Sequence, residues 1–553
     1  MKLRNFANRF LWLICVAVLC CMVPQNHLAP LAFRLFVAAD DTTTVTEKVY
    51  LYDEYNHTAA GESLYTALGI KDYNNYLAKV SESQALNEVV IAVVDTGLDF
   101  TQPVFKDRVL AEYAMDFSSG YLRSSPQTWY QDMNGHGTHV AGLLADLTLP
   151  NVKILPIRIF NGANNSSDSY AFENAIRYIC ALKTGEPMRL LDSSGYANYV
   201  CNSQRKKVNI AAVNMSLGTS GYNTKLASEM QEFKKDKDGY TQYHTTYSGY
   251  QDVLDNLLKN DIVPIVAAGN VDTGKKENPN NSYYSLPAAC DGVLSVAAYD
   301  ETGEPASYSY HNDRISVAAP GSEIWSACTT GVLQTVTDSN GKLSVSKEYT
   351  DAHGNYWLCK ASGREWLLRR VETGEVDEDG KPVARYYLRE SGTSMATPFV
   401  SACYAMLLSD PTKTSAEDFG ITWDKGDSDN YITYARKALL AAAATYGNHY
   451  GITDDGTAEG AYYEEYYGYG TVTVACFAQD DAATAPVLRN IENLIPVSVT
   501  KKTASFKDAY YTETEEDWAM VVIILLMGAI MIWGINRFRA YLIRRKTYDD
   551  GNN

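Results

Sequence analysis

Three short stretches of the chain carry residue types that together could perform acyl transfer. Asp95 stands in "VVDTGLD", His136 in "NGHGTHVAG" and Ser394 in "SGTSMATP". A serine hydroxyl is a poor nucleophile unless an imidazole accepts its proton, and that imidazole needs a carboxylate to fix its tautomer. Each of the three stretches contains glycine, which lets a side chain stand at the edge of a sheet. The three stretches therefore allow nucleophilic catalysis by a serine.

Residues 391–402, which contain Ser394, also have a simpler explanation. Serine and threonine often cap helix N-termini, and alanine-rich runs follow such caps. From this stretch alone, helix capping and a nucleophilic serine are both open. The aspartate and histidine stretches favour the nucleophile, because the three residue types have no structural need to coincide.

The segments that must position these residues alternate between strand-like and helix-like patterns. Runs of β-branched and small apolar residues predict strands at 89–97, 152–160, 208–218, 261–270, 293–300 and 314–321. Helical patterns occupy residues 136–147, 169–182 and 250–260. The alternation predicts an α/β fold with a doubly wound, mostly parallel sheet, whose sites lie at the carboxyl ends of the strands. Asp95, Gly218 and Asn270 all fall at such ends.

The stretches around Asp95, His136 and Ser394 resemble those of the subtilisin-like serine proteases, in amino-acid sequence and in the order Asp, His, Ser along the chain. The most specific parts are "HGTHVAG" and "GTSMATP". The resemblance covers roughly residues 87–480 and is broken by one insertion at 329–390.

The resemblance implies a role for each matching residue. Ser394 would attack the scissile carbonyl, His136 would act as base and then as acid, and Asp95 would orient the imidazole. Asn270 in "AAGN" matches the side-chain donor of the family's oxyanion hole, and the backbone N–H of Ser394 would be the second donor. The alternative for Asn270 is a buried strand end.

Two further segments resemble the walls of the family's substrate site. "NMSLG" at 214–218 matches the strand that pairs with an extended substrate, and the residues before Asn270 would form the opposite wall. The substrate-binding residues implied in this way are Ser216, Leu217, Gly218, Ala267, Ala268 and Gly269. Both segments could also be strand ends with no contact to substrate.

Other polar positions near the motifs point away from a metal site. His139 is interpreted as a structural helix residue, and Asp99 as either a site residue or a loop carboxylate. The calcium-binding loop that many subtilisins carry after "HGTHVAG" is missing, and Val104 stands where a calcium-ligating aspartate is often found. The chain contains no Cys-x-x-Cys pair, so the sequence does not suggest a zinc site. We therefore expect no metal and no cofactor.

Ten cysteines are present, three of them within the first 21 residues. An oxidising location permits disulfides, and the odd number that remains leaves at least one thiol free. Cys403, in the apolar run after Ser394, is the expected free thiol. Cys328–Cys359 and Cys180–Cys201 are the candidate disulfides.

The two ends of the chain predict a membrane-anchored layout. Basic residues followed by an apolar run indicate a signal peptide at 1–39, with an uncleaved N-terminal anchor as the alternative. Residues 518–535 carry no charge and predict a transmembrane helix at 518–536, with a buried core helix as the alternative. The basic segment 537–553 would be cytoplasmic and the body of the protein extracytoplasmic.

Between these ends the chain divides into four parts. Residues 40–86 form an N-terminal extension, too short for the family's usual folded prodomain and expected to be an amphipathic or extended wrap. The peptidase domain spans 87–480, and a polar stalk spans 481–517. The insertion at 329–390 is expected to be β-rich, with its base beside the active-site rim. The insertion either gates the substrate cleft or is a solvent-exposed addition without a role in catalysis.

Composition restricts the partners. The net charge is −18, and no basic patch is evident, which argues against nucleic acid. The sequence predicts a membrane-anchored extracytoplasmic serine endopeptidase that acts on proteins or peptides, with a layout similar to the mycosins. The alternative is a catalytically idle scaffold of the same fold, bound to partners in a membrane assembly of the secretion type.

Overall fold

The computed structural model describes residues 48–118, 132–160, 167, 169–191, 197–219, 222–223, 242–271, 283–339, 342–376, 382–415, 417–421, 431–448, 465–478 and 488. All helices and strands given below belong to the unit formed by residues 50–553.

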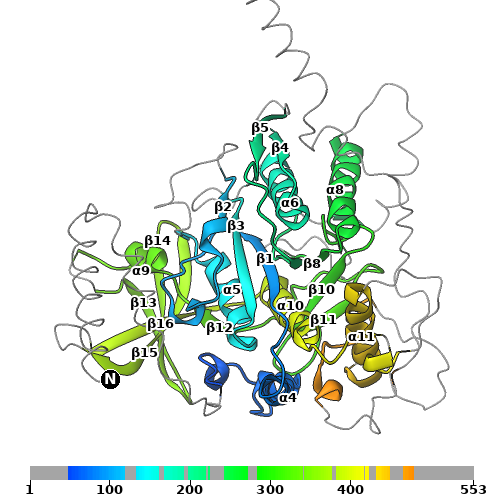
Figure 1. The fold of residues 1–553 in the computed structure, drawn as a ribbon. Helices are drawn as coiled ribbons and strands as arrows, with labels where there is room; N and C mark the ends of the chain where they lie inside the picture. Colours follow the sequence, from blue (N-terminus) through cyan, green and yellow to red (C-terminus); the bar gives the residue numbers. More distant parts are fainter. Residues whose placement is uncertain are drawn as a thin grey trace, which may run out of the picture. The chain divides into compact units, whose positions relative to one another are not determined.

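A seven-stranded sheet forms the centre of the fold, in the order β11-β10-β8-β6-β1-β3-β2 (Figure 1). Its strands are β1 Val89–Asp95, β2 Met115–Asp116, β3 Val152–Arg158, β6 Ile210–Met215, β8 Val263–Ala267, β10 Leu294–Tyr299 and β11 Val317–Pro320. Every neighbouring pair in this sheet is parallel. The predicted α/β class with a mostly parallel sheet is confirmed.

The order of the strands reverses at β1. From β1 the chain first builds β2 and β3 on one side, then crosses to β6 and continues outward through β8, β10 and β11. The carboxyl end of β1 is therefore the topological switch point, where a doubly wound sheet leaves a crevice between its neighbouring loops.

Both faces of this sheet are covered by helices. Val89, Ile91 and Val93 of β1 lie in one apolar cluster, while the alternate residues Val90 and Val94 lie in another. The first cluster contains residues of α4 Ile70–Ser81, α5 His136–Leu147, α10 Thr393–Ser409 and α11 Tyr431–Tyr446. The second contains residues of α6 Ser169–Thr184 and α8 Gln242–Lys259. Burial on both faces explains why β1 is apolar at every position before Asp95.

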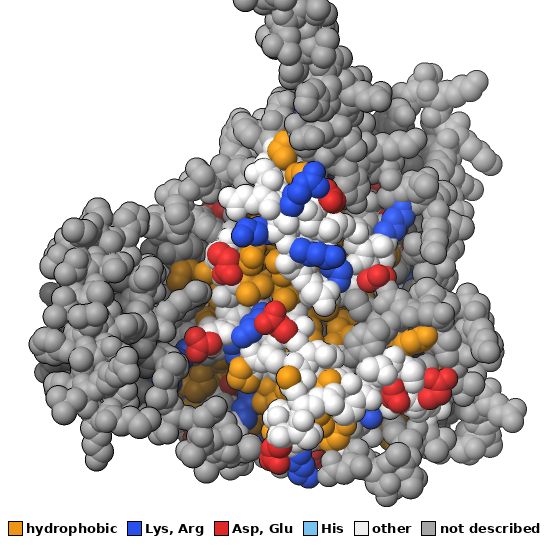
Figure 2. Space-filling view, viewed as in Figure 1, with side chains coloured by type: hydrophobic (Ala, Val, Ile, Leu, Met, Phe, Trp, Pro, Cys, Tyr) orange, Lys and Arg blue, Asp and Glu red, His pale blue; other side chains and the backbone are white. Residues whose placement is uncertain are grey.

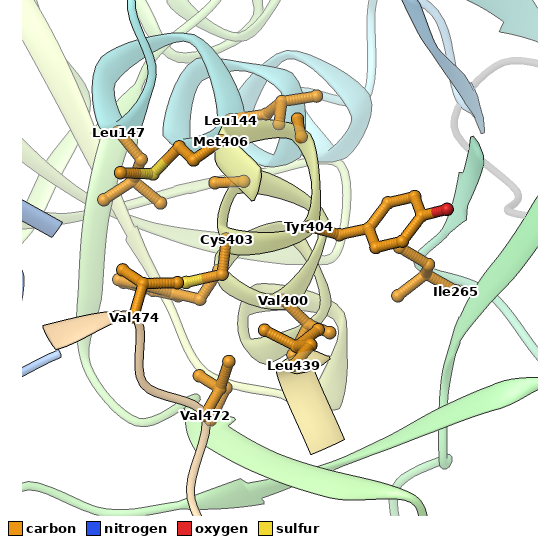
Figure 3. Packing of buried hydrophobic residues seen from close by; sticks show 14 of the residues in the cluster. Leu144, Leu147, Ile265, Val400, Cys403, Tyr404, Met406, Leu439, Val472 and Val474 are labelled. Carbon is orange, nitrogen blue, oxygen red and sulfur yellow. The ribbon is translucent and has the colours of Figure 1, made fainter. Parts of the chain in front are cut away.

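Helix α10 is buried along its whole length, and only Ser394 among its residues is not buried. Figure 3 shows Val400, Cys403 and Met406 of α10 among side chains from α5, α11 and the segment around Val474. Cys403 is 0% exposed and free, as predicted. Because this helix is buried on all sides, its sequence is mostly apolar around its whole circumference.

The N-terminal extension packs into the same cluster. It contains η2 Asp53–Tyr55, α3 Leu64–Ala67 and α4. The buried carboxylate of Asp146 in α5 accepts hydrogen bonds from the backbone N–H of Leu51 (2.8 Å) and Tyr52 (3.1 Å) and from the hydroxyl of Tyr65 (3.0 Å). After α3, the carbonyl of Leu68 accepts from the N–H of Val474 (3.0 Å). Both ends of the described domain are thus joined.

The insertion and the strand before it, β12 Ile324–Ala327, form a second, antiparallel sheet with the order β12-β16-β15-β14-β13. The strands of the insertion are β13 Val345–Asp351, β14 Gly354–Ala361, β15 Arg364–Val376 and β16 Pro382–Glu390. These strands agree with the β-rich prediction. Helix α9 Thr330–Val336 was not predicted; Thr329 caps it by accepting from the N–H of Val332 at 2.9 Å.

The remaining elements are short. Two further antiparallel pairs join β4 Met188–Leu191 to β5 Ala197–Cys201, and β7 Tyr222–Asn223 to β9 Tyr283–Tyr284. The other 3₁₀ turns are η3 Pro103–Phe105, η4 Ala111–Tyr113, η7 Glu417–Phe419 and η8 Ala475–Phe477.

The predicted disulfides are wrong: Cys180, Cys201, Cys328 and Cys359 are all free. Each lies in an apolar cluster and packs there as a small hydrophobic side chain. Burial raises the pKa of Cys180 and of Cys201 to about 12, which keeps both as protonated thiols.

Within the described residues, no helix is both long enough and apolar enough to cross a bilayer. The segments predicted as signal peptide, stalk, transmembrane helix and cytoplasmic tail lie outside the described residues, apart from residue 488. On the face shown in Figure 2, basic and acidic side chains are interspersed, and neither sign gathers into a continuous patch on the described atoms.

Candidate active site

A short hydrogen bond joins Asp95 to His136 at the carboxyl end of β1. Asp95 is the last residue of β1 and His136 the first residue of α5. Nδ1 of His136 lies 2.7 Å from Oδ1 of Asp95, and the same oxygen accepts from the N–H of Thr96 at 2.7 Å. Asp95 is 1% exposed, whereas the His136 side chain is 23% exposed. With Nδ1 occupied, Nε2 is the nitrogen free to exchange a proton with a substrate or a nucleophile.

Asp132, which sequence reasoning missed, holds the turn that leads into His136. Its Oδ1 accepts from the Thr96 hydroxyl (2.9 Å) and from the N–H of Asn134 and Gly135 (3.1 and 2.9 Å). Its Oδ2 accepts from the N–H and the hydroxyl of Thr138, each at 2.9 Å. An aspartate that bonds backbone N–H groups two and three residues later is an Asx turn, and the "DMNG" stretch before His136 carries that signal.

Glycine at 135 and 137 lets α5 begin against the end of β1. A Cβ on Gly137 would lie 2.3 Å from the carbonyl oxygen of Gly97 and 3.1 Å from Cβ of Asp95. Gly135 has φ +98°, and a Cβ there would lie 2.8 Å from a methyl group of Val332. Larger residues at either position would push His136 away from Asp95.

The charges around His136 favour its protonated form. Burial lowers the pKa of His136, but the charge and hydrogen bond of Asp95 outweigh it, and Glu390 and Asp132 add to them, so that the pKa rises to about 9. The imidazolium that forms when a base takes a proton is therefore stabilised here.

Ser394 lies in the first turn of α10 and is tied to the end of β6. Its hydroxyl donates to the carbonyl oxygen of Ser216 at 3.2 Å, and the Ser216 hydroxyl donates to the Ser394 carbonyl at 2.7 Å. That carbonyl is available because residue 398, its ordinary helical partner, is a proline without an N–H. Among the described residues, no hydrogen bond joins the Ser394 hydroxyl to His136.

Asn270 follows β8 beside the start of α10. Its Oδ1 accepts from the N–H (2.9 Å) and the hydroxyl (3.0 Å) of Thr393. The Thr393 hydroxyl also accepts from the N–H of Gly269 at 3.2 Å. These bonds fix the Asn270 carboxamide, and its Nδ2 forms no hydrogen bond to any described residue. The Asn270 Nδ2 and the Ser394 N–H are thus unused donors on the same side of Gly392, where they would lie 3.2 and 3.6 Å from a Cβ.

The two expected walls differ in what they offer to a substrate. The backbones of Leu217 and Gly218 form no hydrogen bond to other described residues, so an extended peptide could pair with them. Ala267 and Ala268 are 2% and 1% exposed, and their side chains are part of the core. Of the second wall, only Gly269 approaches the site through its backbone.

His139 and Asp99 both have structural partners. Nε2 of His139 lies 2.9 Å from the carbonyl of Ile324, and burial lowers the pKa of His139 to about 3, so it stays neutral and joins α5 to β12. Asp99 accepts from the N–H and the hydroxyl of Thr330 at 2.7 Å each, which links the loop after β1 to α9.

One face of the insertion sheet lies against the loop that carries His136. The side chain of Leu388 in β16 would lie 3.4 Å from a Cβ on Gly135. Nη2 of Arg364 in β15 donates to Oδ1 of Asn134 at 3.3 Å. The expected position of the insertion base beside the active-site rim agrees with these contacts.

Asp95 and His136 are joined at the carboxyl end of β1, and Ser394 lies in the first turn of α10, bonded to Ser216 after β6. An aspartate, a histidine and a serine are the residue types that serine hydrolases use. Comparison with known proteins gives the family. Residues 87–470 match the subtilase family model, and the chain belongs to this family. Its enzyme class is that of the serine endopeptidases.

Individual relatives are distant. The major intracellular serine protease of Bacillus subtilis (strain 168) is 24% identical over 51% of this chain and 76% of its own length. Fervidolysin of Fervidobacterium pennivorans is 26% identical over 59% of this chain but only 35% of its own length. The crystal structure of a lanthipeptide protease is 18% identical, with a TM-score of 0.41, over 76% of this chain and 98% of that one.

Proposed function

We propose that this chain hydrolyses peptide bonds through Asp95, His136 and Ser394. The observation that carries the proposal is the 2.7 Å bond between Asp95 and Nδ1 of His136, beside a serine in the first turn of α10. The bond fixes the tautomer in which Nε2 can accept a proton. No metal or cofactor is needed for this chemistry.

Four proton transfers and two bond exchanges would complete the reaction. Ser394 Oγ bonds to the scissile carbonyl carbon while its proton passes to Nε2 of His136. The carbon–nitrogen bond then breaks as His136 gives that proton to the leaving amine, which leaves an acyl ester on Ser394. Water attacks the ester, His136 takes its proton, and the proton returns to Ser394 as the acid product leaves.

The oxyanion of each tetrahedral intermediate would lie between the Ser394 N–H and Nδ2 of Asn270. Both donors belong to groups already fixed by other bonds, so little reorganisation accompanies the reaction. The free backbones of Leu217 and Gly218 would bind the substrate chain as an added strand.

The layout of the chain supports a membrane location for this activity. We propose a signal peptide or N-terminal anchor at 1–39, a transmembrane helix at 518–536 and a cytoplasmic tail at 537–553, on the sequence patterns alone. The substrates would be extracytoplasmic proteins or peptides, and other membrane proteins could bind beside them. The idle scaffold remains the rival function.

Covalent labelling tests the chemistry. A fluorophosphonate probe should label the full chain, and peptide mapping should locate the label on Ser394. Ser394→Ala should remove the label, while Ser391→Ala, a matched change at an exposed serine of the same loop, should keep it. A wild-type chain that stays unlabelled would favour the scaffold, and equal labelling of wild type and Ser394→Ala would exclude Ser394 as nucleophile.

Accessibility to an added protease tests the topology. In intact cells, residues 50–517 should be cleaved from outside, while a tag fused after residue 553 should be protected. Permeabilised cells provide the control, since the tag should then be cleaved. Cleavage of the tag in intact cells would reverse the proposed orientation.

A further inference from the structure

Glu390, the last residue of β16, has no role in the mechanism above, although it stands four residues before Ser394. The Glu390 carboxylate forms no hydrogen bond or ion pair with any described residue, and the residue is of intermediate exposure.

Strand pairing fixes the direction of the Glu390 side chain. Glu390 lies opposite Ile324 in the antiparallel β12–β16 pair, and directly opposite residues share a face. Ile324 is 1% exposed and belongs to the cluster that contains α5, and its carbonyl lies 2.9 Å from Nε2 of His139. The face that carries Glu390 therefore points toward α5.

The neighbouring pair along the strands agrees. Leu388 shares the face of Glu390 because strand side chains alternate with a period of two. Leu388 reaches toward Gly135, the residue before His136. Opposite Leu388, the hydroxyl of Ser326 donates to the backbone carbonyl of His139 at 2.7 Å. Two successive pairs thus face the first turn of α5.

Backbone contacts hold Glu390 in this place. The hydroxyl of Ser391 accepts from the N–H of Glu323 at 2.8 Å, and the N–H of Gly392 donates to Gly321 at 2.8 Å. These bonds fix the two residues that follow Glu390 in the segment leading to Ser394.

We propose that Glu390 is a positioning residue that stabilises the imidazolium of His136 through space, as a second carboxylate besides Asp95. The charge on His136 is largest after it has taken the Ser394 proton, so a nearby anion lowers the barrier to that step. The insertion thereby contributes to catalysis through the strand that returns to Ser394. This inference rests on the proposed function for its catalytic meaning but not for the electrostatic coupling itself.

The titratable and charged groups around this centre come from several elements. They are Asp95 of β1, Asp132 before α5, His139 of α5, Glu390 of β16 and Arg364 of β15. Burial raises the pKa of Glu390; His136 and Arg364 lower it, while Asp132 and Asp95 raise it. Arg364 is thus the nearby counter-charge of Glu390.

The test titrates His136 directly. The full chain is labelled with ¹³C-histidine in the Ser394→Ala background, which prevents self-digestion, and the His136 signal is assigned with His136→Gln. Glu390→Gln should lower the titration midpoint by about 0.5–1 pH unit. Glu323→Gln is the matched control, because Glu323 is an exposed acid directly before β12 that pairs with Arg389. It should leave the midpoint unchanged.

Activity provides the second measurement. With Ser394 intact, kcat/KM should rise with pH as His136 becomes neutral, and the Glu390→Gln profile should shift to lower pH by the same amount. Arg364→Gln, which removes the nearby cation, should move the midpoint upward and serves if Glu390→Gln fails to fold. An unchanged midpoint in both variants overturns the inference. If the His136 midpoint shifts but the fluorophosphonate probe never labels the chain, the coupling between Glu390 and His136 stands and the proposed function is rejected.

Discussion

An Asp95→Asn variant is expected to fold normally and to lose about 10⁴-fold in kcat/KM. The Asn side chain has nearly the shape of Asp, so it can occupy the same place. Both the Thr96 N–H and Nδ1 of His136 approach Oδ1 of Asp95, and Asn carries no negative charge there to stabilise the imidazolium. When the carboxamide turns Nδ2 toward His136, Nδ1 must accept, the ring proton sits on Nε2, and the imidazole cannot take the Ser394 proton. Initial rates on a fluorogenic peptide measure the loss.

Asp116→Asn is the matched control for this experiment. Asp116 also ends a strand of the same sheet, β2, and is 4% exposed, but its carboxylate lies near Arg158 (3.7 Å) rather than near His136. Its kcat/KM should stay within a few-fold of wild type. Asp95→Asn activity within tenfold of wild type would show that Asp95 does not set the tautomer of His136.

The second large effect concerns stability. Asp146→Ala should lower the free energy of unfolding by about 3–5 kcal/mol, because it leaves two backbone N–H groups and the Tyr65 hydroxyl buried without an acceptor. Chemical denaturation in the Ser394→Ala background measures the change without self-digestion.

Asp72→Ala controls for loss of a carboxylate near the same segment. Asp72 is exposed in the first turn of α4. Its replacement should change the unfolding free energy by no more than about 0.5 kcal/mol. If Asp146→Ala were equally mild, residues 51–65 would not be part of the cooperative fold.

Sequence reasoning located the sheet well because its evidence is local. β1, β3, β6 and β8 are apolar runs with a polar residue at or after the carboxyl end, and in a parallel sheet such ends meet at one edge. That alone places Asp95 near Asn270, although 175 positions separate them in the chain.

The missed features depend on contacts that span the fold. The reciprocal bonds between Ser216 and Ser394 require the register of β6 against α10, which no local pattern gives; only Pro398 hinted that the Ser394 carbonyl needed another donor. The disulfide prediction failed because spacing along the chain does not fix the separation of Cβ atoms. Ala267 and Ala268 resemble a wall of the family's substrate site, but the strand buries their side chains.

The bonds that link Leu68 to Thr473 and Val474 have a consequence for how the chain is made. Leu68 and Thr473 are 405 residues apart, and a translating ribosome adds about 5–20 residues per second. The segment around Leu68 is therefore synthesised about 20–80 s before the segment around Thr473 that it binds. During synthesis the apolar side of α4, with Ile70, Tyr73 and Leu77, has no complete core to enter. A nascent chain stalled before residue 473 should thus expose a surface that chaperones bind and proteases cut.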